Sequence, residues 1–246
     1  MNLGTSLTIA AKELKVIRRK KSIISFIVAM PLLYSVLFSL LVLTVFGKTS
    51  TVTLARVLPG YLLSFTYFFV VMASILTTQI ATYSIVGEKV EKSLEPLLAA
   101  PVTDSEILLG KSISAFLPPV IAMWAGSSIF MAAADYVTQN RLSYYYFPNW
   151  SSGVILLLLA PLAAIMSIEI GVMASSRVSD IRGANQIGGL GYVPMLLVFA
   201  AAVSGIIKLN VGTLLIISGI VLAADVALFF LSTSTFNREV ILTKWK

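Results

Sequence analysis

The chain contains no cysteine and no histidine among its 246 residues. Without imidazole or thiolate, it cannot form the common zinc sites, histidine-ligated haem, disulfides or nucleophile systems that pair Ser or Cys with His. Of the usual catalytic chemistries only catalysis by carboxylates stays open. We therefore expect no catalytic residue and no metal site.

Charge is also scarce, because Asp, Glu, Lys and Arg make up only 12% of the residues. Hydrophobic residues make up 58%, and the mean hydropathy is +0.94. These values are typical of a membrane protein and leave no room for a separate soluble domain. A chain of this length accommodates about six spans of 20 to 25 residues. We expect an all-α, polytopic membrane protein with six transmembrane helices in one domain, residues 1–246.

The net charge of +7 is concentrated at the N-terminus, where residues 1–21 contribute five units. Basic residues beside a first span favour anionic lipid headgroups and a cytoplasmic location, so we expect membrane lipids and no nucleic acid as partners. An apolar stripe at 4-3-4-3 spacing predicts an amphipathic interfacial helix within residues 1–21. The stripe consists of Leu3, Leu7, Ala10, Leu14 and Ile17.

Long uncharged runs place the six spans and their orientation. The predicted spans are residues 22–46, 57–86, 107–134, 153–174, 187–207 and 213–232. With the N-terminus inside, cytoplasmic segments carry 14 Lys and Arg residues and outer segments carry four. This positive-inside bias predicts a multi-pass plasma-membrane protein with both termini in the cytoplasm.

Between the second and third spans lies a charged island, Gly87 to Lys111, in which eight side chains ionise. Such a density of charge predicts a wet loop, residues 87–106, on which a soluble partner could dock. Val90, Leu94, Leu97 and Leu98 share one helical face, although Pro96 interrupts the helix. A solvated connector without a partner is the alternative.

The end of this island contains two recognisable local patterns. Thr103 followed by Glu106 is a capping box, which predicts the start of a helix. Gly110-Lys111-Ser112 matches the end of a phosphate-binding loop, but Ser105 stands where that motif needs Gly. We therefore expect no nucleotide site on this chain.

Two carboxylates fall inside predicted spans, Glu169 and Asp225. Charged groups at membrane depth are costly and often mark ion or substrate paths, so both are candidates for a substrate path. Alternatively, Glu169 lies near enough to the interface to reach water or Arg177. A stand-alone channel or secondary carrier using these carboxylates, and a membrane assembly protein without transport, are the other functions left open.

The charged island resembles the signature region of type-2 ATP-binding-cassette (ABC) transporter permeases. The resemblance rests on Glu88-Lys89, the run Leu94-Glu95-Pro96-Leu97-Leu98, Pro101 and Gly110-Lys111. The basic N-terminus, the six spans and the long loop after the second span are similar too. Lys92-Ser93 replaces the Gly-Thr or Gly-Ser pair of many relatives, and residues 208–212 are too short for their larger outer insertions.

The resemblance implies an exporter. The predicted spans lack the dense polar lining expected for a hydrophilic polymer, so a small ion and an amphipathic substrate both remain open. Two permease subunits, identical or divergent, would pair, and a cytoplasmic ABC ATPase would bind the ATP and Mg²⁺ for which this chain has no cofactor site. A second, smaller contact with the ATPase would come from Arg177, Asp180 and Arg182. The main coupling residues implied are Glu88, Glu91, Lys92, Leu94, Glu95, Leu97 and Leu98.

Overall fold

The computed structural model describes residues 3–46, 51–90, 102–178 and 180–235. Within these ranges the chain is almost entirely helical and contains no strand, as the sequence predicts. The elements in chain order are α1 (Leu3–Arg19), α2 (Lys21–Val45), α3 (Thr51–Val90), α5 (Asp104–Leu142), α6 (Trp150–Gly153), η2 (Val154–Leu159), α7 (Ala160–Arg177), α8 (Ile181–Gly188), η3 (Gly189–Gly191), α9 (Val193–Val203) and α10 (Val211–Thr235).

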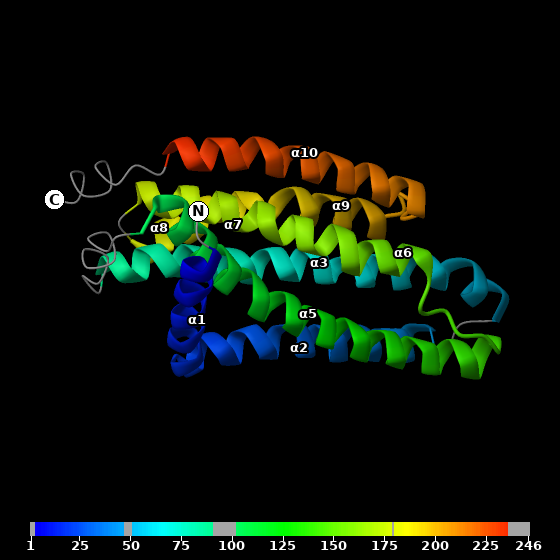
Figure 1. Cartoon of the computed structure of the whole chain (residues 1–246). Coiled ribbons are helices and arrows are strands. Elements are labelled where there is room, and N and C mark those ends of the chain that lie inside the picture. The colour runs from blue at the N-terminus through cyan, green and yellow to red at the C-terminus, as the bar shows by residue number, and fades with distance from the viewer. Residues whose placement is uncertain (1–2, 47–50, 91–101, 179, 236–246) are drawn as a thin grey trace.

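The helices form an elongated bundle that the chain traverses six times (Figure 1). Five described helical segments are long and apolar enough to cross a membrane, and there are six if the bent pair within residues 181–203 is counted as one span. Helix α1 lies across the bundle, nearly perpendicular to the other helices (Figure 1). This arrangement confirms the polytopic fold and suits a helix lying in the plane of the headgroups.

Two helices run further than the sequence predicts. Helix α3 continues four residues beyond the predicted end of the second span, and α5 continues to Leu142 although residues 135–152 were expected to be a loop. The polar residues at these two helix ends did not terminate the helices. Polar side chains near a membrane interface can reach water while their backbone remains helical. Helix α3 has 40 residues and is about 60 Å long.

The fifth crossing is bent by 50° between α8 and α9, whereas the sequence predicts one straight span over residues 187–207. Three glycines lie at the bend, and Pro194 follows in the first turn of α9. Proline lacks an amide hydrogen and restricts the residue before it, which favours a new helix start. The polar segment before the bend is helix α8, where Asp180 caps the N-terminus by accepting from Gly183 N at 2.7 Å.

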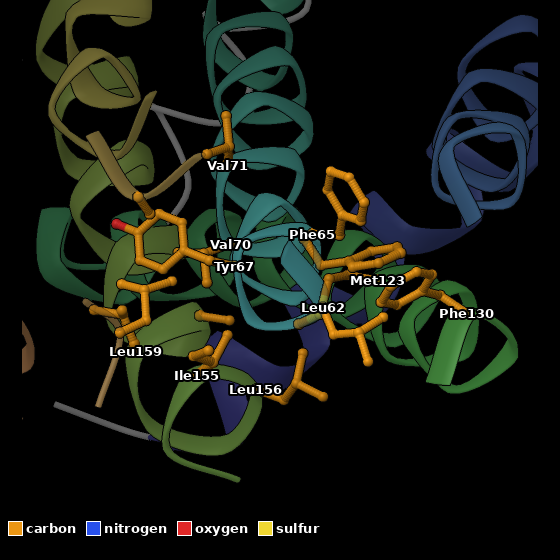
Figure 2. Close-up of a cluster of buried hydrophobic side chains, with 14 of the residues drawn as sticks. Leu62, Phe65, Tyr67, Val70, Val71, Met123, Phe130, Ile155, Leu156 and Leu159 are labelled. Carbon is orange, nitrogen blue, oxygen red and sulfur yellow. The ribbon is translucent and has the colours of Figure 1, made fainter. Parts of the chain in front are cut away.

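The core is organised around α3, which is covered on both sides. Tyr67 points toward α7, and its hydroxyl lies 3.4 Å from the sulfur of Met195 on α9 (Figure 2). On the opposite side of α3, Phe65 faces Phe130 of α5 (Figure 2). Because its two faces are buried by different helices, α3 is the element through which the rest of the bundle is connected.

A π-helical turn, η2, precedes α7, and its hydrogen-bond pattern involves a tryptophan. The amide of Ala160 donates to Ile155 O, five residues back. If this pattern continued, the amide of residue 161 would donate to the carbonyl of Leu156. Residue 161 is a proline and has no N–H, so the Leu156 carbonyl lacks this backbone donor. Trp124 of α5 replaces it, with Nε1 donating to Leu156 O at 2.8 Å.

Replacing this indole is expected to destabilise the bundle. In Trp124→Phe the Leu156 carbonyl is left unpaired in an apolar surrounding, which costs about 1–3 kcal/mol. We expect a lower melting temperature of the detergent-purified protein. Trp150→Phe is the matched control, because Trp150 is 87% exposed and should change the melting temperature little. Equal shifts in the two variants would contradict the assigned hydrogen bond.

At the end of the bundle where α5 ends and α6 begins, a carboxylate holds the aromatic loop after α5. Asp135 Oδ1 accepts from the backbone amides of Tyr146 and Phe147 at 2.9 and 2.8 Å. The Tyr146 hydroxyl donates to Pro59 O at 3.1 Å. Burial, and secondly the nearby Tyr144, raises the pKa of Tyr146 to about 12, so the phenol remains a neutral donor at physiological pH.

Candidate coupling site

Helix α1 packs on the first turns of α5. Its buried face consists of Ser6, Ile9, Ala10, Glu13 and Ile17. The predicted stripe is therefore only partly right, since Ala10 and Ile17 are buried whereas Leu3 and Leu7 are 63% and 58% exposed. The predicted stripe and the buried face differ because α1 has two apolar surfaces. One packs on α5, and the other, with the exposed leucines, is suited to contact with lipid.

The crossing of α1 and α5 depends on Gly110. A Cβ at this position would lie 2.8 Å from Ile9 Cβ and 2.8 Å from the backbone oxygen of Ser6. Real Cβ atoms do not approach other atoms so closely, and the Ser6 oxygen belongs to the helix backbone. Gly110 therefore allows the two helices to touch at the level where α1 crosses the bundle.

The next residue, Lys111, joins three helices. Its side chain is only 2% exposed, and Nζ donates to Ser84 O at 2.8 Å and to Ser84 Oγ at 3.2 Å on α3. The same ammonium lies 3.5 Å from Glu13 Oε1 of α1. Lys111 is the last charged residue of the charged island and falls in the predicted third span. Its charge is buried but paired, which lowers the cost of burying it.

The helices on either side of the segment with the predicted coupling residues, α3 and α5, are linked to each other. On the α5 side the predicted capping box is confirmed: Glu106 N donates to Thr103 Oγ1 at 3.4 Å, and Thr103 N donates to Glu106 Oε2 at 3.0 Å. On the α3 side the Ser84–Lys111 bonds tie the last turns of α3 to α5. The Ser84–Lys111 bonds and the Lys111–Glu13 ion pair thus join α3, α5 and α1.

Most of the predicted coupling residues lie outside the described part of the chain. Glu88 belongs to the last turns of α3, but its side chain is among those not described. The residues outside the described ranges are Glu91, Lys92, Leu94, Glu95, Leu97 and Leu98. Their role stays a prediction, and the structure describes only the helices to which they are attached.

The second predicted contact lies around the start of α8. Arg177 is the last residue of α7 and its side chain is not described, Asp180 caps α8, and Arg182 is exposed on α8. Thr82 of α3 donates to Asn185 of α8, which fixes α8 against α3. Sequence reasoning missed Asn185, because a single polar residue in a polar stretch has no distinguishing pattern.

The two predicted membrane carboxylates lie on helices that pack against each other. Helix α10, which carries Asp225, packs mainly on α7, which carries Glu169. Asp225 is 6% exposed, and neither of its oxygens has a hydrogen-bond partner in the described chain. Glu169 is partly buried, and its Oε2 likewise has no hydrogen-bond partner among the described residues. The alternative pairing with Arg177 stays a prediction, because the Arg177 side chain is outside the described part of the chain.

The features of this site are contacts between helices: an ion pair, side-chain hydrogen bonds and a close helix crossing. Among the described residues, no group of three or more potential ligands could hold a metal ion. The tripod formed by Glu13, Ser84 and Lys111, with Gly110 beside it, was missed as a unit because its members are far apart in the sequence. The signal that could have indicated it is a lone acidic residue on α1 and a lone basic residue at the start of a span.

Comparison with known proteins agrees with this geometry. The family model described as ABC-2 type transporter matches residues 6–206, from α1 through α9 and including the capping box and the Gly110-Lys111 pair. No curated protein matches the chain. The matched region covers well over half of the sequence, so the chain belongs to the ABC-2 type transporter family and is a membrane permease subunit of an ABC transporter.

Proposed function

We propose that this permease exports a small ion or an amphipathic substrate across the plasma membrane, driven by ATP that a separate cytoplasmic ABC ATPase hydrolyses. The observation that carries the proposal is the Glu13–Lys111–Ser84 tripod, which joins three helices beside the segment predicted to meet the ATPase. A flexible connector would not need bonds that join the helices next to it. Because α1, α3 and α5 are joined, a force applied to one of these helices can displace the others.

The proposed mechanism follows from these attachments. Closure of the ATPase dimer pushes on the apolar face around Leu94 and Leu98, and the charged side chains around it make contacts at the rim. The push reaches α3 and α5 through the capping box and the Ser84–Lys111 bonds. Helix α1 resists motion along the membrane normal because its exposed Leu3 and Leu7 stay in the interface. The helices then tilt between inward- and outward-facing arrangements.

Pairing with a second permease subunit, identical or divergent, is part of the proposal. Helices α2 and α10 bury only 22% of their most apolar windows within the described chain. Lipid and a second subunit are the two apolar environments available to such surfaces in a membrane. Both termini lie in the cytoplasm in this scheme, as the distribution of Lys and Arg predicts.

Co-purification tests the docking of the ATPase. The permease is co-expressed with the ABC ATPase encoded in the same gene neighbourhood, and ATPase retention on the tagged permease is measured in detergent. Leu94→Arg and Leu98→Arg place a charge on the predicted apolar face, so we expect retention to fall at least tenfold in each. Ala99→Arg introduces the same charge in the same segment but off that face, and should retain the ATPase.

Two results would contradict the proposal. One is unchanged retention in both leucine variants, which would remove the docking face. The other is flux of substrate in liposomes holding the permease without any ATPase, because a stand-alone channel or carrier needs no partner. Gel filtration of each variant shows whether the permease itself is still folded.

A further inference from the structure

A cavity of about 380 Å³ lies between α5, α7 and α10. Cavities that bind drug-sized molecules usually measure about 300–1,000 Å³, are mostly apolar and carry a few polar groups. This one has apolar walls with two phenylalanine rings, and one carboxylate. The residues around it are Leu109, Ser112, Ile113, Phe116, Leu117, Ile165, Ile168, Glu169 and Phe229.

The second carboxylate lies beside this cavity. Asp225 is four residues before Phe229 on α10, so the two side chains lie on the same face of that helix. Glu169 is eight residues from the end of α7, and Asp225 is ten residues from the end of α10. Both helices end on the same side of the bundle, so the two carboxylates and the cavity lie at one level, in the half of the bundle nearer the predicted ATPase contact (Figure 1).

Neither carboxylate has a counter-ion in the described part of the chain. Both oxygens of Asp225 and Oε2 of Glu169 are buried without a hydrogen-bond partner, and no described Lys or Arg pairs with them. A buried carboxylate needs a positive partner or a proton, because leaving it ionised and unpaired costs several kcal/mol. Lys111 shows that this protein can pair a buried charge, but no described Lys or Arg pairs with these two carboxylates.

We propose that this cavity binds an amphipathic organic cation, whose charge faces Glu169 and Asp225 and whose apolar body lies against Phe116, Leu117 and Phe229. The aromatic rings fit this class of ligand, because the faces of phenylalanine rings attract cations. The inference rests on the proposed function, of which it names the substrate class.

The lining argues against an inorganic cation at this place. Calcium takes six to eight oxygen ligands and magnesium requires a near-complete octahedron of oxygens. The cavity offers one carboxylate and one serine hydroxyl, with a second carboxylate adjacent, and its remaining walls are apolar. For an organic cation with a large apolar surface, contact with these walls compensates the loss of hydration. A strongly hydrated inorganic ion would lose its water ligands without gaining enough oxygen ligands to replace them.

The position of the cavity also relates it to the coupling site. Its α5 wall begins at Leu109, directly before Gly110 and Lys111, on the helix that the capping box starts. A displacement of α5 relative to α7 and α10 would change the shape of the cavity. The energy transmitted through the tripod would thus act on one wall of the binding site.

Binding to the purified permease tests the inference without the ATPase. Radiolabelled tetraphenylphosphonium, a rigid amphipathic cation, is measured by equilibrium dialysis against detergent-solubilised protein, with neutral triphenylphosphine oxide as the competitor. We expect saturable binding that the neutral compound displaces at least tenfold less well than unlabelled tetraphenylphosphonium. The double variant E169Q/D225N should weaken binding at least tenfold, while Phe229→Ala weakens it a few-fold.

The controls separate charge, folding and function. Glu239→Gln removes one negative charge at a position that is not among the lining residues named above, and should bind like the wild type. Because E169Q/D225N replaces unpaired buried carboxylates by neutral isosteres, it should melt no lower than the wild type. Absence of saturable binding, equal displacement by the neutral compound, or unchanged affinity in the double variant would each overturn the inference. Such a failure with normal ATPase co-purification would leave the exporter proposal intact.

Discussion

Lys111→Met is expected to be the most destabilising single substitution at the coupling site. Removing one partner of a buried ion pair leaves the other charge uncompensated and typically costs about 3–5 kcal/mol. Glu13 would retain only Lys12, at 3.3 Å, and Ser84 would lose its donor. We expect a marked fall in melting temperature and loosening of α1, measured by proteolysis after the basic residues Arg18 and Arg19.

A double-mutant cycle distinguishes the pair from its separate members. If Glu13 and Lys111 interact as the distance of 3.5 Å indicates, E13Q/K111M should recover more than half of the stability that K111M loses. The recovery follows because no unpaired buried charge remains. Additive losses would show that the two residues act independently and would contradict the tripod.

Gly110→Ala is expected to separate α1 from α5. The added methyl group would lie 2.8 Å from both Ile9 and the Ser6 carbonyl, and backbone atoms cannot give way without moving α1. Overpacking of this kind costs about 1–3 kcal/mol, more than alanine gains through its better helix propensity. In co-expression we expect normal ATPase binding but reduced transport-coupled ATP hydrolysis, because the docking segment is intact and its attachment is not.

Gly219→Ala provides the matched control. No atom lies within 4 Å of a Cβ at Gly219, which is also inside a membrane helix. The same exchange should there be neutral or stabilising by up to about 1 kcal/mol. Truncating Ile9 to Ala should not rescue Gly110→Ala, because Ile9 Cβ and the Ser6 oxygen remain. A full rescue would show that only a flexible side chain was in the way.

The sequence was sufficient for those features that depend on composition and local pattern. The six crossings follow from uncharged runs, because hydrocarbon excludes charge whatever the fold. The capping box at Thr103 and Glu106 is also local, since both hydrogen bonds are made within four residues. The N-terminal helix was predicted for the same reason.

Features that depend on contacts between distant segments could not be predicted. Glu13 and Lys111 are 98 residues apart. Each is a lone charge that needs a partner, but its local sequence does not say which residue the partner is. Leu3 and Leu7 look like the start of a single stripe, yet the face that α5 buries is offset from them. The bend before α9 was missed because hydropathy averages over glycine and proline, although these residues decide whether a helix is straight.

One consequence of the length of α3 concerns the two ends of the permease. The helix is continuous from Thr51, near the Pro59–Tyr146 contact, to Val90, beside the segment that meets the ATPase in our proposal. Its middle is clamped between α5 on one side and α7 and α9 on the other. A rod pivoting about a clamped centre swings its tips in opposite directions. An inward movement of α3 at Val90 would therefore require an outward movement at Thr51. A single rotation of this helix would then open the permease on one side of the membrane and close it on the other.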